Sequence, residues 1–235
     1  MKIHKKLFIY LFLSFIGFTV IGTLSHELGH FAVAKYLGYN MRINYGQTLW
    51  DNDSIMDFMS STSIKYREQL NQDLDFPGKE KYFALRKQYT RDSFWITLGG
   101  PMQTLLTGSI GLVLLSFAYK RKKHAEQLSL TIWLFIFMSL FWLRQTANLV
   151  MFYKSYFFKG KLSMRGDEAK LSSNLELPVW SLDVVTGILG VIVLLFIVFK
   201  IVPKPTRFTF LLAGLFGGIT GYVLWLETVG PILMP

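Results

Sequence analysis

The feature that most constrains this chain is the gathering of its apolar residues into long blocks. Each block is close to, or longer than, the roughly 20 residues that a helix needs to cross the hydrocarbon core of a bilayer. Only 17% of the residues are charged. We therefore expect neither a water-soluble enzyme nor a disordered chain, but an all-α membrane protein. The predicted architecture is one polytopic domain over residues 1–235, a bundle of about five transmembrane helices at 7–37, 94–119, 128–153, 179–202 and 208–229.

The first block could be mistaken for a signal peptide, because Lys2, Lys5 and Lys6 precede it. It is longer than the 7–15 apolar residues typical of a signal peptide, and no small-x-small cleavage site follows it. We therefore predict a retained helix that continues to Leu37 and ends near Gly38.

The formal net charge is +10, with a sequence pI near 9.7. Basic residues gather at the ends of apolar blocks, where anionic headgroups and topology explain them, so we expect a lipid bilayer and no nucleic acid as partner. The positive-inside rule places the N-terminus in the cytoplasm, and a bacterial plasma membrane is the expected location. Loop 154–177 weakens this orientation, since it should lie outside yet is more basic than acidic. The orientation rests on three clusters that fall on one side: Lys2, Lys5 and Lys6; Lys120, Arg121, Lys122 and Lys123; Lys200, Lys204 and Arg207.

The only sizeable polar region, residues 39–92, lies between the first two spans. At its start Met41, Ile43 and Tyr45 alternate with polar residues, which predicts a short strand and, with a partner, a β-hairpin. Such a strand could bind an extended peptide along its edge, or it could simply cap the bundle.

The sequence His26-Glu27-Leu28-Gly29-His30 is an HExxH motif within the first apolar helix. Residues i and i+4 share one face of a helix, so both imidazoles can bind one ion. Zinc accepts two histidines and a carboxylate and keeps a fourth position for water, and Glu27 would act as the general base. The chain contains no cysteine, so any metal must have nitrogen and oxygen ligands.

This motif, followed by Ala34 and Gly38, resembles that of the site-2 protease family of intramembrane zinc metalloproteases, of which the chain would be a divergent member. The resemblance implies cleavage within the membrane and a second motif, GPxxN, near the substrate. Here Gly100-Pro101-Met102-Gln103-Thr104 is similar, with Thr104 in place of the asparagine and Gln103 offering an amide one position earlier. The usual active site of that family lies nearer the cytoplasm than the one expected here.

The third zinc ligand of that family is an aspartate, and Gly166-Asp167-Glu168 is the best match, although no glycine follows Asp167. Two adjacent carboxylates can hardly bind one ion, so Asp167 is the preferred ligand and Glu168 the alternative. A solvated acidic turn is the structural alternative to both. Asp51 and Asp53 are weaker candidates, because Asp-Asn-Asp-Ser is a turn composition.

His26 follows Lys6 by about 30 Å of helix, which places the motif near the far boundary of the bilayer. The Gly99-Gly100-Pro101 segment is expected at the same boundary, either as a kink or loop that shapes the substrate cleft or as a helix start at Pro101. Arg144 and Asn148, four residues apart, should lie there too. Arg144 could hold Asp167 or an anionic intermediate, or it could reach lipid headgroups; Asp183 and Glu227 are its candidate partners.

The sequence thus predicts a membrane-embedded zinc metalloprotease that hydrolyses peptide bonds in or beside membrane-spanning substrates. Its partners would be a membrane-protein or peptide substrate and the lipid bilayer, and its cofactor Zn²⁺. The alternative is a non-catalytic membrane binding or assembly protein that retains or has lost its zinc. A transporter ranks last, because the sequence shows no repeated halves.

Overall fold

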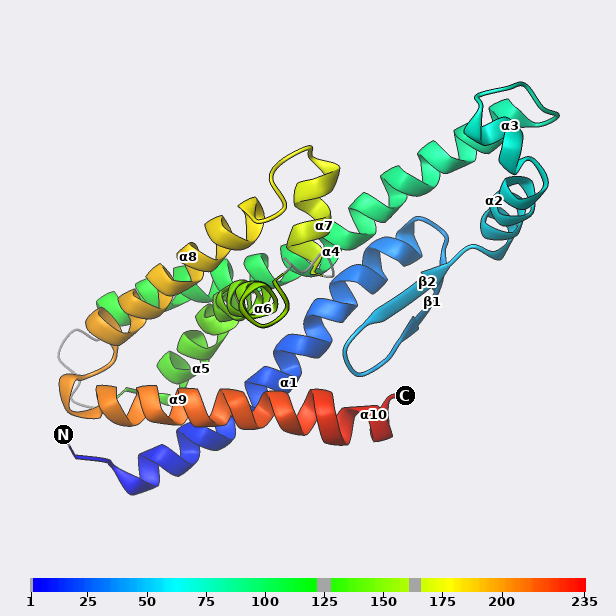
Figure 1. Cartoon of the computed structure of the whole chain (residues 1–235). Helices are drawn as coiled ribbons and strands as arrows, with labels where there is room; N and C mark the ends of the chain where they lie inside the picture. The colour runs from blue at the N-terminus through cyan, green and yellow to red at the C-terminus, as the bar shows by residue number, and fades with distance from the viewer. Residues whose placement is uncertain (1, 122–127, 161–165) are drawn as a thin grey trace.

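The computed structural model describes residues 2–121, 128–160 and 166–235. Within them, five helical segments are long and apolar enough to cross a membrane, as expected for an integral membrane protein. Figure 1 shows them as a bundle beside a small β-hairpin. The segments are α1 (Lys5–Tyr36); α4 (Lys79–Arg121); α5, η1 and α6 (Leu130–Ser139, Leu140–Trp142, Leu143–Lys159); α8 and η2 (Ser181–Phe196, Ile197–Ile201); and η3, α9, η4 and α10 (Lys204–Thr206, Arg207–Tyr222, Val223–Val229, Gly230–Leu233).

The long polar region is folded into short elements rather than left as a loop. Asn40–Ile43 (β1) pairs antiparallel with Thr48–Asp51 (β2), so the predicted hairpin is confirmed. Asp53–Lys65 (α2) and Arg67–Asn71 (α3) follow, and the first turns of α4 complete the region. Asp167–Asn174 (α7) lies between the third and fourth long segments.

The expectation of a loop or of a helix start at Gly99-Gly100-Pro101 is wrong. Helix α4 is 43 residues long, or about 64 Å, and Pro101 lies inside it, so this proline neither starts nor ends a helix. Packing of α4 against α1 over a long contact holds the segment helical despite the missing backbone donor. The boundaries of the other spans agree with the prediction to within a few residues, except that the third and fifth helices extend further at their C-terminal ends.

Helices α1 and α4 approach closely at Gly29 and Gly99. A Cβ atom on Gly99 would lie 2.5 Å from the Gly29 carbonyl oxygen, and a Cβ on Gly29 would collide with the Gly99 carbonyl. The two backbones therefore touch within the HExxH motif itself, at Gly29, as small residues at a membrane helix interface allow.

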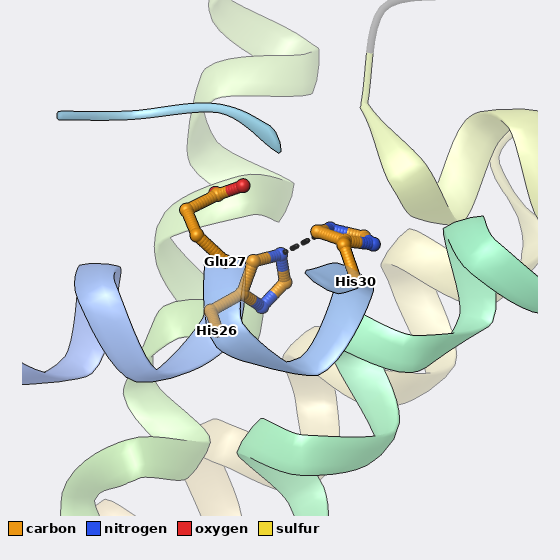
Figure 2. Close-up of side chains that lie close together, drawn as sticks. All are labelled: His26, Glu27 and His30. Atoms are coloured by element: carbon orange, nitrogen blue, oxygen red, sulfur yellow. Dashed lines mark hydrogen bonds between the residues drawn. The ribbon is translucent and has the colours of Figure 1, made fainter. Parts of the chain in front are cut away.

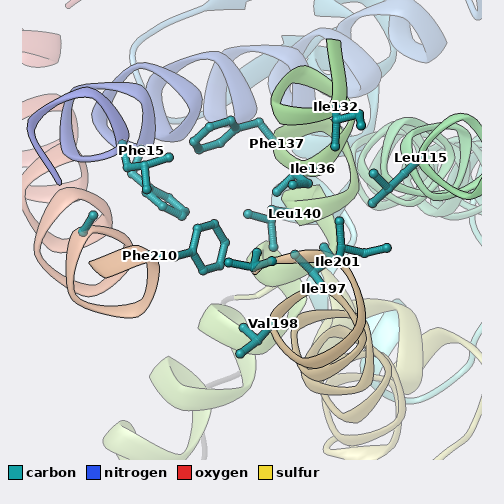
Figure 3. Packing of buried hydrophobic residues seen from close by; sticks show 13 residues of the cluster. Phe15, Leu115, Ile132, Ile136, Phe137, Leu140, Ile197, Val198, Ile201 and Phe210 are labelled. Carbon is teal, nitrogen blue, oxygen red and sulfur yellow. The ribbon is translucent and has the colours of Figure 1, made fainter. Parts of the chain in front are cut away.

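The apolar core lies in the other half of the bundle (Figure 3). Phe15 of α1 packs edge-on against Phe137 of α5 and tilted against Phe210 of α9, with ring centroids 4.9 and 5.5 Å apart. Leu115 of α4 and Ile197 of η2 are fully buried in the same cluster. Phe15 precedes His26 by about 16 Å along α1, so this core fixes the helices and leaves the polar cluster at the far end.

The chain ends are arranged as the topology prediction requires. The N-terminus and the α8–α9 connection lie at one end of the bundle, whereas the hairpin and the C-terminus lie towards the other (Figure 1). Lys122 and Lys123 of the middle basic cluster lie outside the described residues. The cytoplasmic location of the N-terminus stays a prediction.

Candidate metal centre

Three side chains from two distant parts of the chain meet at the HExxH motif. His26 and His30 lie one turn apart on the same face of α1, and their Nε2 atoms are 3.2 Å from each other. Figure 2 shows these two imidazoles facing each other beside Glu27. Asp167, the first residue of α7, brings its Oδ2 atom to 3.0 Å from Nε2 of His26 and 3.2 Å from Nε2 of His30.

The other nitrogen of each imidazole has a partner that fixes its proton. Nδ1 of His30 lies 2.7 Å from the Ile96 carbonyl oxygen, which can only accept, so Nδ1 carries the hydrogen even though the Gly100 N–H lies 3.3 Å away. Nδ1 of His26 lies 2.9 Å from the Thr104 hydroxyl, whose own hydrogen is donated to the Gly100 carbonyl. We assign both Nδ1 atoms as donors, which turns the Nε2 lone pairs towards each other.

Two imidazole lone pairs and a carboxylate oxygen this close together need a positive charge among them. One proton could bridge only one of the three pairs, whereas one metal ion satisfies all three. A tetrahedral ion with bonds of about 2.0–2.1 Å separates its ligand atoms by about 3.3–3.4 Å, close to the separations found here. The donor set therefore fits a metal ion.

Gly100 keeps open the space that faces both imidazoles. A Cβ atom at this position would collide with Nε2 of His30 and lie 2.6 Å from Nε2 of His26. Only glycine leaves the two nitrogens uncovered, which explains the glycine of the Gly100-Pro101 pair by geometry.

Gly100→Ala should therefore remove metal binding, because its methyl group occupies the position in front of both nitrogens. Elemental analysis of the purified variant should find less than one tenth of the wild-type metal content. Gly218→Ala is the matched control: it is the same change in a membrane helix, at a site with nothing within 4 Å. Full metal content in Gly100→Ala would contradict this geometry.

Glu27 lies beside the centre and points away from the two imidazoles (Figure 2). The Thr48 hydroxyl of β2 lies 2.9 Å from its carbonyl oxygen and 3.1 Å from its Oε2. Nη2 of Arg144 lies 3.9 Å from its Oε1. Donor atoms of His26, Glu27 and His30 all lie within 4.8 Å of one another, so this buried trio could also hold a metal ion. Oδ2 of Asp167 lies only 3.0 and 3.2 Å from the two Nε2 atoms, which makes Asp167 the better third donor.

Glu168 points away from the centre towards α6. Both of its carboxylate oxygens accept from Nδ2 of Asn148 at 3.2 Å. Burial, followed by the charge of Asp167, raises the pKa of the Glu168 carboxyl. Asp167 instead points towards the two imidazoles, so the two adjacent carboxylates have different partners.

A cleft of about 1020 Å³ opens onto the centre. Glu27, His30 and Asp167 form its floor, β2 borders one side, and Arg144 and Asn148 of α6 border another. The cleft is large enough to receive an extended peptide segment beside the three donor atoms.

Several of the other predicted site residues lie outside the metal centre. Pro101 is buried within α4, and the Gln103 amide donates to the Thr107 hydroxyl rather than reaching the centre. Arg144 contacts Glu27, and among the described residues no ion pair joins it to Asp167, Asp183 or Glu227. Asp51 ends β2 and Asp53 begins α2, both outside the cluster.

Two contacts at the centre were missed by the sequence analysis. The Thr48 hydroxyl at the start of β2 contacts Glu27 of α1, and the Ile96 carbonyl accepts from Nδ1 of His30. A backbone carbonyl carries no residue-type signal, and Thr48 is one threonine among many. The role of Thr104 as a partner of His26 could have been suspected from its place four residues after Gly100, since both lie on one face of α4.

Comparisons with protein-family models, with curated proteins and with solved structures give no match.

Proposed function

We propose that the chain is a membrane-embedded zinc metalloprotease that hydrolyses peptide bonds in or beside membrane-spanning substrates. The observation that carries the proposal is the convergence of Nε2 of His26, Nε2 of His30 and Oδ2 of Asp167 within 3.2 Å, with the Glu27 carboxylate beside them. Two histidines and one carboxylate are a ligand set of catalytic zinc, which leaves a fourth position open. The expected setting is a bacterial plasma membrane with the N-terminus in the cytoplasm.

When bound, the zinc ion would polarise the substrate carbonyl and lower the pKa of a water molecule. The residues of the chain supply the rest. Glu27 would take a proton from the attacking water molecule while the water oxygen bonds to the carbonyl carbon of the substrate. It would then pass that proton to the departing amide nitrogen as the C–N bond breaks. Arg144, at the wall of the cleft, would stabilise the negative charge on the former carbonyl oxygen.

Thr48 and Arg144 position the base. The hydroxyl donates to Oε2 of Glu27 and the guanidinium lies near Oε1, so the carboxylate is held at the edge of the centre rather than over it. Because both partners belong to elements that border the cleft, a substrate would meet the base as soon as it entered.

The proposal is tested by reversible removal of the metal. The substrate is a synthetic transmembrane peptide with a central Asn-Pro pair, which weakens its helix and exposes peptide bonds, carrying a fluorophore and a quencher. Cleavage in detergent should stop after treatment with a chelator and return when one equivalent of Zn²⁺ is added. His30→Ala, treated in the same way, should stay inactive at every zinc concentration. Cleavage that persists in the zinc-free protein would refute the proposal.

A non-catalytic zinc protein is the second candidate, and one observation favours it. The Glu27 carboxylate lies within 4.8 Å of the histidine donor atoms, so a small rotation would give four protein ligands and a closed structural site. A closed site would bind zinc without hydrolysing any peptide, and it would lose affinity when Glu27 is changed.

A further inference from the structure

A second, separate groove lies between α4 and the end of α7. Its lining includes Phe83, Arg86, Lys87, Arg91 and Phe94 of α4, with Leu175 from the end of α7, and its volume is about 640 Å³. Helices α4 and α7 lie in contact beside each other (Figure 1). The proposed cleavage mechanism uses none of these residues.

The inner end of the groove lies at the level of the lipid headgroups. The uncharged stretch of α4 begins after Asp92, so the hydrocarbon boundary falls near Phe94. Arg91 precedes Phe94 by about 4 Å of helix and lies within the headgroup layer, which is about 5–7 Å thick, whereas Arg86 precedes it by about 12 Å and lies at the aqueous side of that layer. Trp95 and Trp180 mark the same level on two helices, with half-exposed indole rings of the kind that gather at membrane interfaces.

The chemistry of the groove fits a phospholipid with an anionic headgroup. Arg86 and Lys87 are exposed, and no acidic side chain lines the groove among the described residues. Arg91 makes two contacts of 3.1 Å with the buried Asp92 and is still 66% exposed. Basic pockets between helices at this depth bind lipid phosphates, while apolar walls such as Phe94 and Leu175 accept the first part of an acyl chain.

We propose that this groove binds an anionic phospholipid, with the phosphate and headgroup held by Arg86, Lys87 and Arg91. The lipid would bridge α4 and α7, and α7 carries Asp167 at its first residue. A lipid at this position would therefore also fix the helix that brings the third donor atom to the centre. This site stands whether or not the chain is a protease.

The test measures lipid retention by native mass spectrometry of the detergent-purified chain. Phosphatidylglycerol, phosphatidylcholine and inorganic phosphate are titrated separately. We expect phosphatidylglycerol to bind more tightly than phosphatidylcholine, and phosphate alone to leave no adduct. Arg86→Gln with Lys87→Gln should weaken phosphatidylglycerol binding about 30-fold, since each basic residue near a membrane surface contributes about a fivefold attraction.

Lys65→Gln with Arg67→Gln is the matched control. It removes the same two charges from exposed positions at the α2–α3 junction, and we expect it to leave binding unchanged. Equal losses in both double variants would mean general surface attraction and would overturn the groove. Equal binding of phosphatidylcholine, wild-type affinity in Arg86→Gln with Lys87→Gln, or equally tight retention of inorganic phosphate would each overturn it too.

Discussion

Glu27→Gln should abolish peptide hydrolysis while leaving the metal in place. The substitution keeps the size of the side chain and its contact with the Thr48 hydroxyl, which lies 3.1 Å from Oε2, but it removes the ability to accept a proton. General bases contribute about 10²–10⁴-fold to such reactions. We therefore expect cleavage of the transmembrane peptide to fall about 10³-fold, with one zinc per chain by elemental analysis.

Glu227→Gln is the control for this experiment. Glu227 is an exposed carboxylate in η4, so the same chemical change there should leave both cleavage and metal content as in the wild type. The two outcomes that oppose the expectation differ in meaning. Unchanged cleavage would remove Glu27 from the mechanism, whereas loss of zinc together with activity would make Glu27 a fourth ligand and favour the structural site.

Much of the architecture could be predicted because the bilayer imposes it. Five apolar blocks long enough to span hydrocarbon leave helices as the only regular structure that satisfies their backbone groups, and the structure has five such helices at those places. The hairpin was predicted from the alternation around Met41 and Ile43. Both predictions rest on how apolar residues are distributed along short stretches of the chain, which is a local property of the sequence.

The break at Pro101 was the clearest failure, and its cause is tertiary. Local rules predict a helix end or an irregular segment at Gly-Gly-Pro. In the fold, Gly29 and Gly99 let α1 and α4 touch, and this contact keeps α4 helical through the proline. The glycines therefore serve close packing and an open metal centre rather than a turn, which a single sequence cannot distinguish.

Spacing alone predicted the centre only where its residues share a helix, and Asp167 came from the family resemblance. His26, Glu27 and His30 follow from a spacing of four residues, but their outer partners come from α4 and β2, tens of residues away. Arg144 was expected to contact Asp167, an anionic intermediate or lipid headgroups, and its Nη2 lies 3.9 Å from Oε1 of Glu27. The position of a long side chain depends on how α6 packs, and no local pattern encodes that.

Replacement of Asp167 should release the metal, whereas replacement of its neighbour should not. Oδ2 of Asp167 contacts both imidazole Nε2 atoms, while both carboxylate oxygens of Glu168 accept from Asn148. Changes to groups that hydrogen-bond a metal ligand typically reduce metal affinity 10–100-fold, and Glu168 hydrogen-bonds Asn148 rather than a ligand. Loss of a ligand should exceed this, so we expect zinc affinity to fall by more than about 100-fold in Asp167→Ala and by less than about tenfold in Glu168→Gln.

Competition with a fluorescent zinc chelator would give both affinities, with His30→Ala as the reference for loss of one ligand. Asp167→Asn keeps the shape of the side chain and separates a lost charge from a misfolded α7, and it should also bind zinc poorly. If zinc remained bound in Asp167→Ala and was lost in Glu168→Gln, the third ligand would lie one residue further along α7. That result would require α7 to turn by about 100°, which would break the contact between Asn148 and Glu168.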